Sequence, residues 1–125
     1  MRPKRTILCV DDNEQALSIR KVMLETRGYR VVACTSGQQA LEAFRQGGVD
    51  LVLTDLLMPG MDGWHFRREQ QHDPALAAIP VVVCSGTGDA DLHAAALGAI
   101  GFIDKPIDPD SLLDTIRRVL GPARA

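Results

Sequence analysis

The chain has 125 residues, 46% of them hydrophobic, and a formal net charge of −2 from 14 basic and 16 acidic side chains. This length supports one domain with a substantial core, so we expect residues 1–125 to form a single domain with a short tail at 121–125. Because the basic residues form no extended stripe, binding of nucleic acid by this chain alone is not expected. No apolar run approaches the roughly 20 residues that span a bilayer, and no signal-peptide core follows the N-terminus, so we expect a cytoplasmic protein without membrane contact.

The three cysteines limit the redox and metal chemistry open to the chain. Cys9, Cys34 and Cys84 lie far apart, each inside an apolar run that is typical of a strand. There is no C-x-x-C pattern, so neither a zinc site nor a redox-active pair is indicated. We expect all three thiols to be buried and reduced.

The first predicted strand and helix occupy residues 5–10 and 14–27. Asn13 is a favourable N-cap for this helix, and Gly28 is suited to end it because glycine adopts the left-handed conformation at little cost. Apolar residues at steps of three and four predict its buried stripe: Ala16, Leu17, Ile19, Met23 and Leu24.

A second strand is predicted at 29–35. Ser36 and Gln39 after it have the spacing of a capping box, which indicates the start of a helix that ends at Gly47 and Gly48. In the second half of the chain, strands are predicted at 50–54, 81–84 and 101–104, and helices at 63–72, 91–97 and 109–120. The last of these helices has Asp108 as its N-cap and Pro109 in its first turn.

Five strands that alternate with five helices predict an α/β fold. Strands separated by helices require right-handed crossovers, so the sheet should be parallel and doubly wound, with helices on both faces. The carboxyl ends of all five strands then meet at one edge of the sheet.

That edge should collect the side chains that follow the strands, namely Asp11, Asp12, Asp55, Ser85 and Lys105. Carboxylates so close together repel one another, so we expect at least one of them to have a raised pKa in the metal-free protein. A hard cation such as Mg²⁺, which prefers oxygen ligands, would relieve this repulsion. A hydroxyl and an ammonium group add donors for phosphoryl oxygens. The sequence therefore predicts a site for metal and phosphate together.

These residues resemble the receiver domain of bacterial two-component response regulators, the family of the chemotaxis protein CheY, over essentially the whole chain. The resemblance rests on Asp11-Asp12 after the first strand, Asp55 followed by LLMPGMDG, Ser85, Phe102 and Lys105-Pro106. It implies a (βα)5 flavodoxin-like fold.

The resemblance also implies a role for each site residue. Asp55 would accept a phosphoryl group from a sensor histidine kinase or a histidine phosphotransfer protein. Mg²⁺ would be bound by Asp12 directly, by Asp11 mainly through water, by Asp55 and by the backbone carbonyl of Leu57. Lys105 would pair with a phosphoryl oxygen, and Ser85 and Phe102 would act as the switch that alters a surface for a downstream protein, which the sequence does not identify.

Two features depart from the family pattern. Only 16 residues separate Ser85 from Phe102, which is shorter than usual, and Gly86 stands where a small alanine is common. We therefore expect the loop after the fourth strand and the following helix to be short or irregular.

Another class of protein also uses a nucleophilic aspartate on a similar sheet. An Mg²⁺-dependent phosphohydrolase of the haloacid-dehalogenase kind needs a second acid two residues after the nucleophile, and Leu57 occupies that position. The sequence therefore favours a signalling phosphoacceptor, not an enzyme, with autophosphorylation and autodephosphorylation at most.

Overall fold

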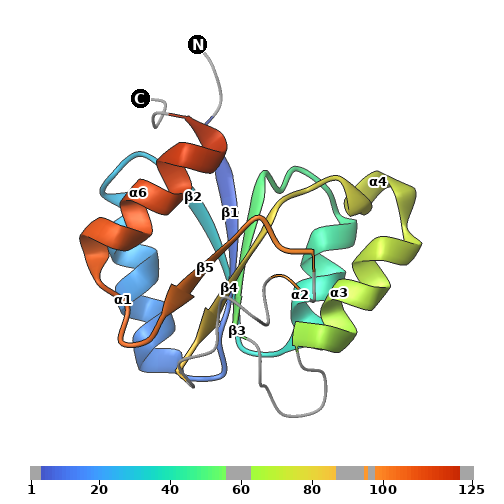
Figure 1. The fold of residues 1–125 in the computed structure, drawn as a ribbon, viewed down its shortest axis with the longest axis horizontal. Coiled ribbons are helices and arrows are strands. Elements are labelled where there is room, and N and C mark those ends of the chain that lie inside the picture. Colours follow the sequence, from blue (N-terminus) through green and yellow to red (C-terminus); the bar gives the residue numbers. More distant parts are fainter. Residues whose placement is uncertain (1–3, 56–62, 87–94, 96–97, 122–125) are drawn as a thin grey trace.

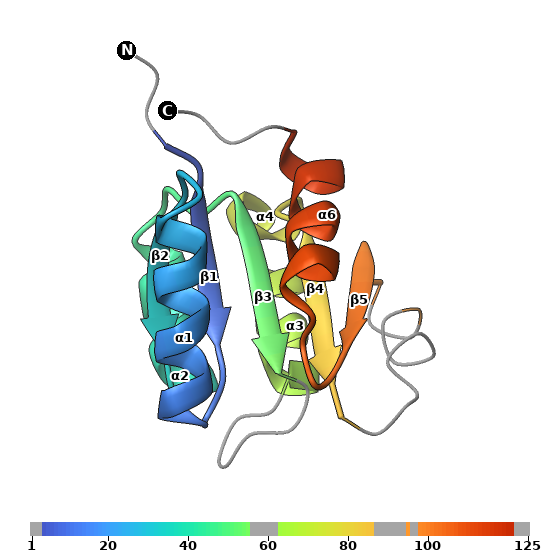
Figure 2. The same cartoon turned by 90° about the vertical axis from the view of Figure 1, so that its left-hand side faces the viewer.

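The computed structural model describes residues 4–55, 63–86, 95 and 98–121, with the backbone alone at 63–66 and 75. Its five strands form one sheet in which every described pairing is parallel (Figure 2). The strands are β1 (Thr6–Val10), β2 (Arg30–Cys34), β3 (Leu51–Asp55), β4 (Val81–Ser85) and β5 (Gly101–Asp104), in the spatial order β2-β1-β3-β4-β5. This order is the flavodoxin-like one, so the predicted fold class is confirmed.

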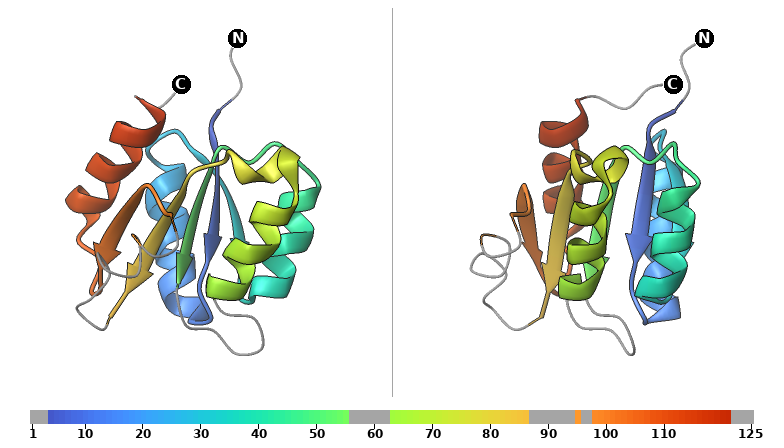
Figure 3. Two further views of the ribbon diagram at one scale, coloured as in Figure 1. Left: turned by 45° about the vertical axis from the view of Figure 1, so that its right-hand side comes forward. Right: turned by 90° about the vertical axis from the view of Figure 1, so that its right-hand side faces the viewer.

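The helices cover both faces of the sheet, as Figures 1 and 3 show. One face carries α1 (Glu14–Glu25) and α6 (Pro109–Leu120), and the other carries α2 (Gly37–Arg45), α3 (Gly63–His72) and α4 (Pro74–Ala77). The short helix α4 was not predicted, and the helix predicted at 91–97 lies, apart from Ala95, outside the described residues. Among the described residues, every helix is too short or too polar to cross a bilayer.

Alternate residues of the strands build two separate cores. In β1, Ile7 and Cys9 pack on the side of α1 and α6, whereas Leu8 and Val10 pack on the side of α2, and all four side chains are fully buried. A strand that is covered on both faces has no polar alternation, which is why these runs are continuously apolar. Cys9, Cys34 and Cys84 are buried and free, as predicted.

The helix ends largely match the predicted caps. Asn13 accepts a hydrogen bond from the amide of Ala16 at 3.0 Å, and Asp108 accepts one from Ser111 at 3.0 Å. Gly28 has a φ of 94°, the left-handed conformation expected of it.

The capping box at α2 is only half formed. The Ser36 hydroxyl accepts from the amide of Gln39 at 3.2 Å, but the side-chain Oε1 of Gln39 accepts from the amide of Thr35 at 3.1 Å instead of from that of Ser36.

The predicted stripe of α1 is wrong in part. Ile19 is 70% exposed, and the buried residues of the helix are Leu17, Arg20 and Leu24. These three also follow steps of three and four, so the pattern permitted two stripes. The helix is turned so that the stripe containing an arginine faces the sheet, which places a charged side chain inside the fold.

Candidate functional site

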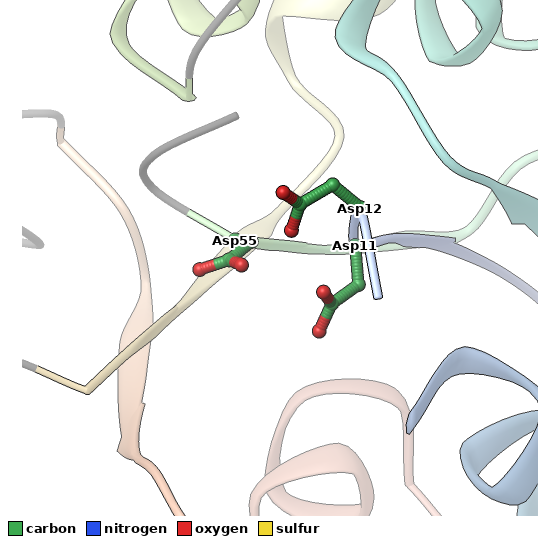
Figure 4. A group of neighbouring side chains, drawn as sticks. All are labelled: Asp11, Asp12 and Asp55. Atoms are coloured by element: carbon green, nitrogen blue, oxygen red, sulfur yellow. The ribbon is translucent and has the colours of Figure 1, made fainter. Parts of the chain in front are cut away.

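Three aspartates meet at the carboxyl edge of the sheet, as predicted. Asp11 and Asp12 follow β1, and Asp55 is the last residue of β3, the strand that pairs with β1 in parallel. Each carboxylate offers one oxygen, and these oxygens all lie within 4.8 Å of one another. Figure 4 shows the three side chains together at the ends of the two strands.

Lys105 lies inside this acidic cluster. Its backbone amide donates to the carbonyl of Ser85 at 2.8 Å, which continues the β4–β5 pairing one residue beyond β5. The ammonium group donates to Asp55 Oδ2 at 2.9 Å and to Asp11 Oδ2 at 3.1 Å. The predicted lysine of the site is therefore in contact with two of the three acids.

Asp11 also contacts Arg20, a neighbour that was not predicted from the sequence. The side chain of Asp11 is 1% exposed, and its Oδ1 accepts from the amide of Asn13 at 2.9 Å. The guanidinium Nη2 of Arg20, a side chain that is itself 6% exposed, lies 3.3 Å from Asp11 Oδ2. The sequence signal for this contact is the spacing of Arg20 from Leu17 and Leu24, which puts all three on the inner stripe of α1.

These contacts lower the pKa of Asp11, so this residue is not the aspartate with a raised pKa that the sequence predicted for the cluster. Burial alone would raise the pKa of this carboxyl group, but the Asn13 amide, the hydrogen bond and charge of Lys105 and the charge of Arg20 together lower it below its usual value. Burial alone would likewise lower the pKa of Lys105, but its hydrogen bonds to Asp55 and Asp11 raise it. At Asp11 the neighbouring donors and cations therefore outweigh the effect of burial.

The two predicted switch residues lie on the last two strands. Ser85 ends β4 with a buried side chain, and Phe102 in β5 is 46% exposed. Phe102 pairs with Val83, two residues before Ser85 on the same strand. Since residues two apart on a strand share a face, and paired residues do too, Ser85 and Phe102 lie on one face of the sheet. Phe102 thus has access to solvent on the face to which Ser85 belongs.

The oxygen donors of the site fit a hard cation. Carboxylate groups are the ligands that Mg²⁺ prefers, and the spacing of Asp11, Asp12 and Asp55 allows one ion to reach an oxygen of each. Leu57, the predicted source of a carbonyl ligand, lies outside the described residues.

Comparison with known proteins agrees with this arrangement. A family model described as the response regulator receiver domain matches residues 7–117. Protein PilH of Pseudomonas aeruginosa is 34% identical over 117 residues, which cover 91% of this chain and 96% of PilH. Chemotaxis protein CheY4 of Vibrio cholerae has a similar structure, with a TM-score of 0.85 and 27% identity over 93% of this chain and 98% of that one.

Other relatives are longer proteins. The response regulator GtcR of Aneurinibacillus migulanus is 33% identical over 96% of this chain, but the match spans only 48% of GtcR. The residues that the family model matches include Asp11, Asp12, Asp55 and Lys105 of the acidic edge. The family model covers most of the chain and PilH matches along nearly its whole length, so the chain belongs to the family of response regulator receiver domains of two-component systems.

Proposed function

We propose that Asp55 is the phosphoacceptor of this receiver domain and that its phosphorylation depends on Mg²⁺ held by Asp11, Asp12 and Asp55. The observation that carries this proposal is the position of Lys105, whose ammonium group bonds Asp55 and Asp11 within a cluster of three carboxylates. A nucleophilic oxygen, an acidic metal site and a cation for phosphoryl oxygens are thereby supplied by the ends of β1, β3 and β5.

The transfer follows from the chemistry of a carboxylate and a phosphohistidine. An oxygen of Asp55 attacks the phosphorus, a new O–P bond forms, and the P–N bond breaks with its electron pair left on the imidazole nitrogen of the donor. When bound, Mg²⁺ supplies positive charge that offsets the charge of the carboxylates and of the phosphoryl oxygens. Lys105, already in contact with Asp55, is placed to bond one of these oxygens in the product.

The donor and the readout follow from membership of the family. Receiver domains take phosphoryl groups from sensor kinases, so we assign a histidine kinase or a histidine phosphotransfer protein as the donor. We further assign Ser85 as the residue that bonds the new phosphoryl group and Phe102 as the residue that responds to it. Their shared face of the sheet and the exposure of Phe102 support this coupling.

The proposal is tested with a small phosphodonor. Acetyl phosphate with Mg²⁺ should add one phosphoryl group to the protein, detected by intact mass, and EDTA or Asp55→Asn should prevent the addition. Asp104→Asn is the matched control, because Asp104 ends β5 at the same edge but has an exposed side chain. If phosphorylation persisted in Asp55→Asn, or was lost equally in Asp104→Asn, Asp55 would not be the specific acceptor.

A further inference from the structure

Arg20 is a buried cation that the proposed transfer chemistry does not use. It lies between Leu17 and Leu24 on the inner stripe of α1, where an apolar side chain would pack without the free-energy cost of burying a charge. Burying a charged group is unfavourable unless it is paired. Among the described residues, the acid that pairs with Arg20 is Asp11, so the guanidinium is directed into the acidic site and not into solvent.

The contact between Arg20 and Asp11 is much more buried than the ion pair between Lys21 and Glu25 on the same helix. Lys21 and Glu25 on the same helix form a pair at 3.6 Å, but their side chains are 42% and 44% exposed. Water and salt screen such a pair, which contributes little. Arg20 and Asp11 are almost fully enclosed, so the field of the guanidinium acts on the site with much less screening.

Arg20 and Lys105 contact the same oxygen, Asp11 Oδ2. With both cations present, the three carboxylates of the cluster leave one formal negative charge in excess. Without Arg20 there would be two. A divalent cation is attracted by this excess charge, so the second cation should weaken its binding.

We propose that Arg20 is a positioning residue that holds Asp11 in place without metal and lowers the affinity of the acidic site for divalent cations. This inference rests on the proposed function, because it concerns the same metal site. Through Arg20, the inner face of α1 would set the concentration of Mg²⁺ at which the acidic site becomes occupied. Occupancy of a weakened site follows the free concentration of Mg²⁺ more closely than occupancy of a tight one.

The test is calorimetric titration of Mg²⁺ into the metal-free full chain. Arg20→Met should bind Mg²⁺ about tenfold more tightly than the wild type, since one weakly screened positive charge is removed near the site. Arg20→Gln, which keeps a hydrogen-bond donor without the charge, should show the same direction and serves if the methionine variant does not fold. Arg20→Lys should stay close to the wild type.

Lys21→Met is the matched control, because it removes one positive charge from an exposed position of the same helix. It should leave the affinity for Mg²⁺ unchanged. The difference between wild type and Arg20→Met should persist at roughly 0.5 M KCl, where the field of surface charges is largely screened.

The outcomes separate the two proposals. If the wild type binds Mg²⁺ but neither Arg20→Met nor Arg20→Gln binds it more tightly, the role of Arg20 is overturned and the metal site stands. If the tightening is matched by Lys21→Met or disappears in high salt, it is a general effect of surface charge and the role of Arg20 is again rejected. Absence of binding in all variants would overturn both proposals.

Discussion

The pKa of Asp11 depends on the cations and donors beside it. Repulsion alone predicts a raised pKa, yet the pKa of Asp11 is lowered because Asn13, Lys105 and Arg20 outweigh burial. Asp12, by contrast, is exposed at the same strand end. Asp11 is therefore buried and Asp12 exposed, so substitutions of these two residues should affect the free energy of unfolding differently.

The lowered pKa of Asp11 predicts acid sensitivity of the metal-free protein. Its folded-state pKa lies below the unfolded value of about 3.9, so the ionised group stabilises the fold above that value. This stability is lost as pH falls from about 4 through the folded pKa. The free energy of unfolding, measured with urea in EDTA between about pH 6 and 3, should fall more steeply in the wild type than in Asp11→Asn. Equal dependence of the free energy of unfolding on pH in the two proteins would show that the fold does not stabilise the ionised form of Asp11.

The cysteines should be unreactive in the folded protein. Burial raises the pKa of Cys9 to about 12 and that of Cys84 to about 11, so almost no thiolate exists at neutral pH. Burial also raises the pKa of Cys34. A thiol reagent that absorbs on reaction should label the native protein slowly at pH 8 and all three thiols rapidly in urea. Rapid labelling of the native protein would contradict the predicted burial.

At the scale of the element, α1 links local sequence to the site. Its N-cap is set by Asn13, whose backbone amide also bonds Asp11, and its inner face carries Arg20 to the same carboxylate. The start and the rotation of one helix thus determine two of the contacts of Asp11. The exposed face of α1 includes Ile19 and Val22, so apolar character by itself does not identify the buried side.

Removal of the cap should weaken the fold without disabling the metal site. Asn13→Ala loses the bond to the Ala16 amide but keeps the backbone donor to Asp11, so we expect a loss of about 1 kcal/mol in the free energy of unfolding and little change in Mg²⁺ affinity. Gln15→Ala, an exposed change in the first turn, is the control and should be nearly neutral. A Mg²⁺ affinity that fell in Asn13→Ala would mean that the cap also holds the site.

At the scale of the whole molecule, the sheet brings together acids from separate parts of the chain. Binding of a cation only to this folded arrangement must stabilise the fold, by about 2.7 kcal/mol when its concentration is 100 times the dissociation constant. The melting temperature of the wild type should therefore rise with Mg²⁺. By the same linkage, the metal-free protein should be the less stable form.

The variant Asp12→Asn distinguishes the repulsion among the three carboxylates from the stabilisation that Mg²⁺ binding should give. Because Asp12 is exposed and adds a third negative charge to the cluster, its neutralisation should raise the melting temperature in EDTA and reduce the further rise with Mg²⁺. Asp55→Asn should not stabilise in the same way, since Lys105 would lose a charged partner at 2.9 Å. Thermal melts of the three proteins with EDTA and with Mg²⁺ provide the measurement. A wild type that matched Asp12→Asn in EDTA and did not respond to Mg²⁺ would exclude a shared metal pocket.

Local sequence was enough to predict most of the fold and which charged side chains meet at the carboxyl edge of the sheet. Continuous apolar runs identified the strands, caps such as Asn13 and Asp108 located helix starts, and alternation of strands and helices implied a parallel sheet whose ends gather Asp11, Asp55 and Lys105. These features depend on neighbours in the chain or on general rules of chain connection, so they can be inferred without coordinates.

Only the tertiary structure decided how α1 is turned and how the acids are balanced. Both stripes of α1 satisfy helical periodicity, and the choice of the one with Arg20 depends on a partner, Asp11, that the sheet brings beneath it. The lowered pKa of Asp11 similarly depends on Lys105, which is 94 residues away in the chain. Packing and electrostatic energies are sums over neighbours in space, and that set of neighbours is defined only when the chain has folded.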